Sequence, residues 1–193
     1  MRLLIDDVVD LLRFRVKPLG EYQYPRWQTL LFLIALGLVA SADTAELGDN
    51  LTGRMLFMVL FTLAETLCFA GFIGLWLRFA KWDGHGSLFG LVAVASGLQF
   101  VEPLTSWLPD DAALAVNGVL SIFGILVLVN ALAVVSGIHR LRVALGVLLF
   151  APVAMVLLAG ALSLGSAAGW VDLPAGVADA ARGAESSAPA SGI

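Results

Sequence analysis

The sequence of 193 residues is poor in charge, in cysteine and in histidine. Charged residues make up 13% of it, against roughly 25% in a typical soluble domain, so a water-soluble fold of this size could not cover its surface. Cys68 is the only cysteine, which excludes an internal disulfide and a cysteine-based metal site. The only histidines are His85 and His139, so we expect no histidine-ligated metal and no other cofactor. No basic cluster is long enough to indicate a nucleic-acid partner.

Apolar residues, by contrast, make up 60% of the chain and gather in five long runs. A membrane-spanning helix needs about 20 mostly apolar residues to cross roughly 30 Å of hydrocarbon. The runs cover residues 27–42, 55–77, 84–109, 112–138 and 143–171. The first run is short, so its span is expected to include Tyr24 and Pro25 at the inner end. In lipid the backbone must satisfy its own hydrogen bonds, which leaves helices or a closed β-barrel. These runs do not alternate apolar and polar residues as barrel strands do. The predicted fold class is therefore all-α, a polytopic membrane helix bundle of five transmembrane helices.

The basic residues predict how these spans are oriented, because Lys and Arg collect on the cytoplasmic side of a membrane. With five spans, nine of the eleven basic residues lie before the first run or in the loops after the second and fourth. The N-terminus is therefore predicted to be cytoplasmic and the C-terminus to lie outside. The composition, rich in Ala, Gly and Leu, favours a bacterial inner membrane. All five tryptophans fall at predicted span ends, where an aromatic belt belongs.

We divide the chain into three predicted segments. Residues 1–26 form a cytoplasmic N-terminal segment, residues 27–171 the transmembrane domain, and residues 172–193 a disordered outward-facing tail rich in small residues and Pro. Within the first segment, residues 2–17 have the pattern of an amphipathic helix that Pro18 ends. Its apolar face consists of Leu4, Ile5, Val8, Leu11, Leu12 and Val16. We expect this face either to lie on the inner leaflet as an interfacial helix or to dock on a partner protein.

The polar residues inside the predicted spans are the candidate site. Glu65 and Glu102 are carboxylates in apolar runs, and at ~1.5 Å per residue both fall in the outer half of adjacent antiparallel helices. Gln99 and Asn117 lie at similar depths. One interpretation is a proton- or cation-responsive site, since two close carboxylates share a proton readily. The other is structural, in which a protonated Glu hydrogen-bonds a neighbouring helix.

Three short stretches carry a resemblance to a known family. These are Tyr24-Pro25-Arg26-Trp27, the stretch 84–90 (GHGSLFG) running on to Pro103, and the stretch 137–145 (GIHRLRVAL) leading to Pro152. Over residues 10–168 the chain resembles bacterial members of the Yip-domain family, named for Ypt/Rab-interacting proteins. The resemblance implies a cytoplasmic N-terminal stretch, five spans and an outward C-terminus. Glu65 and Glu102 match no motif of that family.

Three functions are weighed on this basis. The first is a non-enzymatic scaffold or accessory subunit of a membrane assembly, as the resemblance implies, in contact with lipid and with a membrane-protein partner or further copies of itself. The second is a small ion- or proton-coupled transporter that uses Glu65 and Glu102. The third, an intramembrane enzyme, lacks a nucleophile motif, a metal set or an acid/base pair in the sequence. We therefore predict no catalytic residues.

Overall fold

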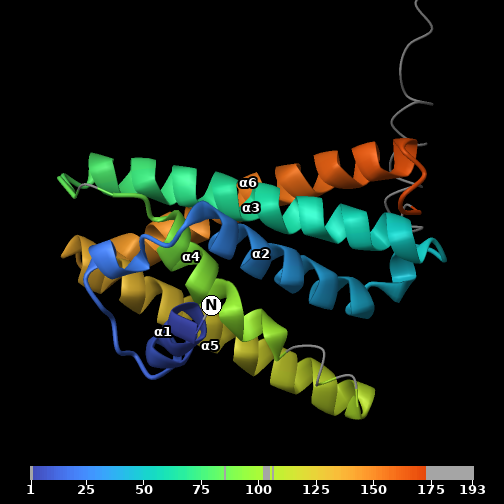
Figure 1. Cartoon of the computed structure of the whole chain (residues 1–193), viewed down its shortest axis with the longest axis horizontal. Helices are drawn as coiled ribbons and strands as arrows, with labels where there is room; N and C mark the ends of the chain where they lie inside the picture. Colours follow the sequence, from blue (N-terminus) through green and yellow to red (C-terminus); the bar gives the residue numbers. More distant parts are fainter. Residues whose placement is uncertain (1, 85, 102–104, 106, 173–193) are drawn as a thin grey trace, which may run out of the picture.

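The computed structural model describes residues 2–84, 86–101, 105 and 107–172, and within these ranges every regular element is a helix (Figure 1). The α-helices, in chain order, are α1 (Arg2–Leu12), α2 (Arg26–Ala40), α3 (Leu51–Phe79), α4 (Phe89–Ala95), α5 (Asp110–Ser136) and α6 (Arg140–Ala167). Short 3-10 helices accompany them: η1 (Leu19–Tyr22), η2 (Ser41–Asp43), η3 (Ala45–Leu47) and η4 (Ser96–Phe100). The predicted all-α class is therefore confirmed for the described residues. Glu102 and residues 173–193 of the predicted tail lie outside them.

Three of the helices are long and apolar enough to cross a membrane, namely α3 with 29 residues, α5 with 27 and α6 with 28. At ~1.5 Å per residue each is roughly 40 Å long. The first and third predicted spans form shorter apolar helices than expected. Helix α2 has 15 residues, roughly 22 Å, and the helical part of the third run consists of the seven residues of α4 and the five of η4. All five apolar runs thus form helices, but only three of them reach full span length.

The third run is interrupted by its own small and polar residues. Gly86 takes a left-handed φ of 142°, and the Ser87 hydroxyl oxygen accepts a hydrogen bond from the Phe89 amide at 3.2 Å, so the α-helix begins only at Phe89. Helix α4 passes into η4 at Ser96, whose hydroxyl donates back to a carbonyl one turn earlier. Gly97, a poor helix former, follows directly.

The N-terminal helix also ends earlier than predicted, at Leu12 rather than next to Pro18. Phe14 takes a left-handed φ of 58°, and the following amide donates to the Asp10 carbonyl at 2.8 Å. This is the Schellman ending of a helix, with Phe14 at the position that glycine usually occupies. The turn brings the Lys17 ammonium back to within 3.1 Å of the Asp10 carboxylate. The helix therefore ends in a chain reversal that an ion pair holds.

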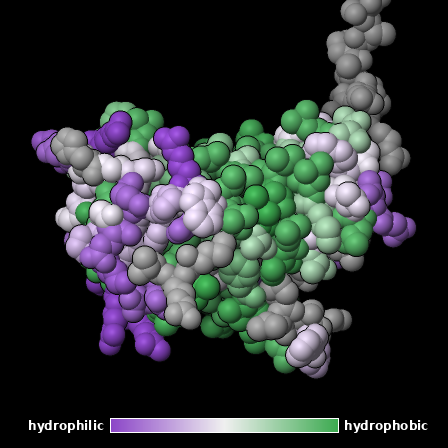
Figure 2. All heavy atoms as spheres, viewed as in Figure 1, coloured by the Kyte–Doolittle hydropathy of each residue, from purple (hydrophilic) through white to green (hydrophobic). Residues whose placement is uncertain are grey.

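Helix α3 packs between α2 and α6, while α5 runs obliquely to α3 and contacts α6 (Figure 1). Hydrophobic atoms form a broad middle zone on the face shown in Figure 2, and hydrophilic atoms gather at the end where α3 finishes and η1 lies. This distribution suits a helix bundle in a bilayer, because the apolar belt contacts the hydrocarbon of the lipid and the polar end contacts water.

Helix α4 lies at the centre of the bundle, in contact with α1, α2, α3 and α5. Every residue from Gly90 to Ala95 is buried. Leu91 and Val94 belong to the main apolar cluster with Ile73 of α3 and Leu132 of α5. Ala93 packs instead with α2 in a second cluster. A helix of only two turns therefore connects two layers of the apolar core.

Glycine permits the closest approach between α2 and α3. A methyl group built on Gly37 of α2 would lie 2.6 Å from the Cα atom of Val59 and 3.0 Å from the carbonyl oxygen of Met58. Small residues at such crossings let two backbones meet, and van der Waals contact then holds the helices together. Gly71 of α3, by comparison, has nothing within 4 Å of such a methyl.

We expect Gly37→Ala to lower the stability of the protein in detergent, because the added methyl meets backbone atoms that can move only by separating α2 from α3. Overpacking of this kind costs about 1–3 kcal/mol and should appear as a lower Tm in thermal unfolding. Gly71→Ala is the matched control, and its Tm should stay the same or rise, since alanine favours the helix. Equal changes in Tm for the two variants would contradict this account of the α2–α3 contact.

Candidate functional site

The structure places the described members of the predicted polar cluster on three different elements. Glu65 lies half-buried on α3, Gln99 is exposed on η4, and Asn117 lies half-buried on α5. Asn117 accepts a hydrogen bond from the Thr105 hydroxyl at 2.9 Å. Among the described residues no hydrogen bond joins Glu65, Gln99 and Asn117 to one another. Because Glu102 lies outside these residues, the pairing of two carboxylates stays a prediction.

A different polar cluster forms around Asp7 of α1, whose residue is only 4% exposed. We call Asp7, Asp10, Lys17, Tyr22 and Tyr24 the Asp7 cluster. The Lys17 ammonium lies 2.5 Å from one carboxylate oxygen of Asp7, and the Tyr24 hydroxyl donates to the other. The backbone amide of Lys17 donates to the Tyr22 hydroxyl oxygen at 3.0 Å. One network thus joins side chains from α1, from the turn after it, from η1 and from the segment before α2.

The electrostatics of this cluster favour a charged lysine and neutral tyrosines. Hydrogen bonds from Lys17 to Asp7 and Asp10 raise the pKa of the lysine well above its usual value, so it stays protonated. Burial, and then the hydrogen bond to Asp7, raise the pKa of the Tyr24 phenol, which therefore remains a donor. Burial likewise raises the pKa of Tyr22. A buried carboxylate is costly unless paired, so the contacts with Lys17 and Tyr24 offset the cost of burying Asp7.

Sequence reasoning overlooked Asp7, although a signal was present. Asp7 lies three residues after Leu4 and four before Leu11, which places a carboxylate on the apolar stripe of the helix. Leu4 and Leu11 are buried in the core that α4 and α5 of the same chain build. The buried part of the apolar face therefore packs on the protein's own bundle, an arrangement that sequence reasoning did not consider. Ile5 and Val9 remain exposed.

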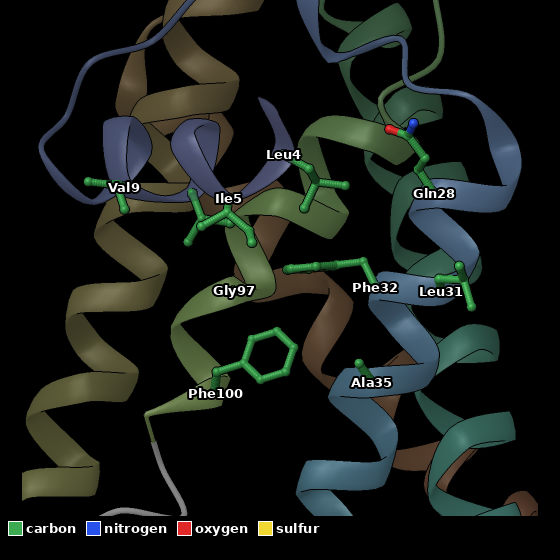
Figure 3. Close-up of a pocket in the computed structure, with 10 residues that line it drawn as sticks. Leu4, Ile5, Val9, Gln28, Leu31, Phe32, Ala35, Gly97 and Phe100 are labelled. Carbon is green, nitrogen blue, oxygen red and sulfur yellow. The ribbon is translucent and has the colours of Figure 1, made fainter. Parts of the chain in front are cut away.

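A cavity of about 430 Å³ opens between α1, α2 and η4, and we call it the α1 pocket (Figure 3). Ile5 and Val9 reach it from α1, Leu31 and Phe32 from α2, and Phe100 from η4. Gln28 is the one polar side chain among its lining residues and lies at one end of it in Figure 3. Walls of this kind suit a hydrocarbon chain or an apolar side chain, and offer no group for acid–base chemistry.

No family model, curated protein or solved structure matches this chain. The resemblance to the Yip-domain family accordingly stays a prediction from the three stretches that carry it. Within the described residues, no three His, Cys, Asp or Glu side chains come together in a way that could hold a metal ion.

We expect Asp7→Asn to loosen α1 from the bundle, because the amide cannot accept the lysine and tyrosine hydrogen bonds as a carboxylate does. Hydrogen–deuterium exchange of α1 in detergent should become faster by about tenfold, the scale of one lost hydrogen bond to a charged group. The control is Asp6→Asn, which makes the same charge change at an exposed neighbouring position and should leave the exchange of α1 unchanged. Similar acceleration in both variants would show that the Asp7 cluster does not anchor α1.

Proposed function

We propose that this chain is a five-helix integral membrane protein that acts as a non-enzymatic scaffold or accessory subunit. Helices α3, α5 and α6 have the length and composition of membrane spans. Helix α2 and the α4–η4 segment are apolar and pack alongside them. Five crossings keep the basic loops on one face, with the N-terminus cytoplasmic and the C-terminus outside in a bacterial inner membrane. A bilayer can thin locally around short spans at modest cost.

The observation that carries the proposed role is the large apolar surface of α5 and α6 that the bundle itself leaves uncovered. Within an apolar stretch of 18 residues, only 17% of α6 is buried, 28% of α3 and 33% of α5. The exposed large side chains on the two helices include Leu114, Val119, Ile122, Leu126, Leu148, Met155, Val156 and Leu164. Such faces contact lipid or the helices of a partner, because neither surrounding penalises apolar side chains.

Labelling of introduced cysteines in a Cys68→Ser background tests the number of crossings. Asp83 and Asp111 are exposed residues on either side of the α4–η4 segment. In intact cells a membrane-impermeant maleimide should label Asp111→Cys but not Asp83→Cys, which should react only after lysis. Both variants replace an exposed aspartate by cysteine, so each serves as the control for the expression and thiol reactivity of the other. Labelling of both positions under the same condition would show that the α4–η4 segment does not cross.

One observation favours a second candidate function, that of a small ion- or proton-coupled transporter. Glu65 lies within α3 and makes no ion pair or hydrogen bond with any other described residue. A carboxylate in a membrane span without such a partner is expensive, and residues of this kind often mark ion pathways. With Glu102 outside the described residues, Glu65 alone carries this alternative.

The two functions predict opposite results for Glu65→Gln. For a scaffold, the variant should fold, keep its Tm within a few degrees and co-purify in mild detergent with the same stoichiometric partner or further copy as the unmodified chain. For a transporter, vesicles containing the unmodified chain should dissipate an imposed pH gradient, and Glu65→Gln should abolish that flux. We expect co-purification and no flux. A monodisperse monomer, or flux that depends on Glu65, would overturn the scaffold proposal.

A further inference from the structure

A second cavity, of about 680 Å³, lies between α5 and α6 at the ends where the two helices are joined, and we call it the α5–α6 groove. Leu126, Val129 and Val134 of α5 face Leu141 and Ala144 of α6 across it. Phe14, from the turn after α1, forms a further wall and packs edge-on against Phe123 of α5 with ring centroids 5.7 Å apart. The remaining lining residues, Asn130 and Arg140, are polar.

Asn130 is the polar group inside the groove. It is only 9% exposed, and its carboxamide makes no hydrogen bond with any other described residue. Its amide atoms keep some accessible surface at the wall of the groove, since among the described residues Arg54 Nε is the buried side-chain polar atom that lacks a hydrogen bond. A carboxamide that lines a cavity and has no protein partner is therefore available to hydrogen-bond an oxygen of a bound molecule.

Arg140 is the charged group of the groove. It is the first residue of α6, it is exposed, and it forms no ion pair among the described residues. The guanidinium presents several donors in a planar fork that matches the oxygens of a phosphate. The groove thus combines one exposed guanidinium, one amide without a hydrogen bond to another described residue, and walls of hydrocarbon.

The depths of these groups along α5 follow the order of groups in a phospholipid. Asn130 lies six residues before Ser136, the last residue of α5, which is roughly 9 Å along the helix. Leu126 lies roughly 15 Å along it, half of the ~30 Å hydrocarbon thickness. Arg140 follows just beyond the end of α5. A phosphate at Arg140, ester oxygens near Asn130 and acyl chains reaching Leu126 would therefore fill the groove within one leaflet.

We propose that the α5–α6 groove binds one glycerophospholipid with an anionic headgroup, such as phosphatidylglycerol. The Arg140 guanidinium binds the phosphate, the Asn130 amide hydrogen-bonds a glycerol ester oxygen, and the acyl chains lie between α5, α6 and Phe14. The leaflet in which the lipid lies, the cytoplasmic one, rests on the orientation given under the proposed function, whereas the binding itself does not. Basic grooves between spans on the cytoplasmic side are where anionic lipids bind membrane proteins.

Native mass spectrometry of the full chain in detergent can test this site. The probes are phosphatidylglycerol and phosphatidylcholine with identical acyl chains. We expect one phosphatidylglycerol to be retained, with an affinity about fivefold higher than that of phosphatidylcholine, the effect of one basic residue on an anionic lipid. Arg140→Gln should remove this preference, and Arg140→Lys should keep part of it. Asn130→Leu should weaken the binding of both lipids, because both carry ester oxygens.

The matched control is Arg142→Gln, which removes the same charge two residues away from a side chain that does not line the groove. It should leave the preference for phosphatidylglycerol unchanged, and thermal unfolding without added lipid should show that all variants are folded. Equal retention of the two lipids, an equal loss of preference in Arg140→Gln and Arg142→Gln, or a lipid-free dimer formed through this face would overturn the proposal. None of these results depends on topology or flux, so the site and the scaffold role can fail separately.

Discussion

The burial of α4 at the centre of the bundle is the constraint on which the rest of the structure depends. This two-turn helix has neighbours on all sides, so α1, α2, α3 and α5 are positioned by their contacts with it. The closest contact is at Gly90, where a methyl group would lie 2.0 Å from the carbonyl oxygen of Tyr22. Only glycine lets η1 cross the start of α4 at this distance. The position of the N-terminal segment therefore depends on the absence of a side chain at Gly90.

The docking of α1 combines two interactions of different character. Leu4 and Leu11 add apolar burial, which is strong but tolerates small shifts of the helix. Asp7 adds a charge that must be satisfied by Lys17 and Tyr24, and only one position of the helix satisfies it. Apolar burial thus holds α1 to the bundle, while the polar network defines where it sits. The α1 pocket exists because α1 in that position bridges over η4 without filling the space toward α2.

The surface of the molecule supports binding more readily than chemistry. Helices α5 and α6 present apolar side chains outward over most of their length, and the α1 pocket is lined almost entirely by hydrocarbon. The described polar groups of the apolar zone do not converge on one point: Glu65 is on α3, Asn117 of α5 pairs with Thr105, and Asn130 lines the α5–α6 groove. Reactions need several polar groups that converge on one point, whereas helix association and lipid binding do not.

The sequence by itself determined the helical class and the positions of α3, α5 and α6, because a long apolar run with at most one charge satisfies its backbone in lipid by forming a helix. It also placed the loop between the fourth and fifth runs, close to the end of α5, where Gly137 takes a left-handed φ of 67°. Only the tertiary structure decided that η1 crosses α4 at Gly90 and that Asp7 is buried. Both depend on partners distant in the chain, since the Tyr22 carbonyl meets Gly90 and Tyr24 reaches back to α1. Local patterns carry no information about such contacts, which arise only when the helices pack.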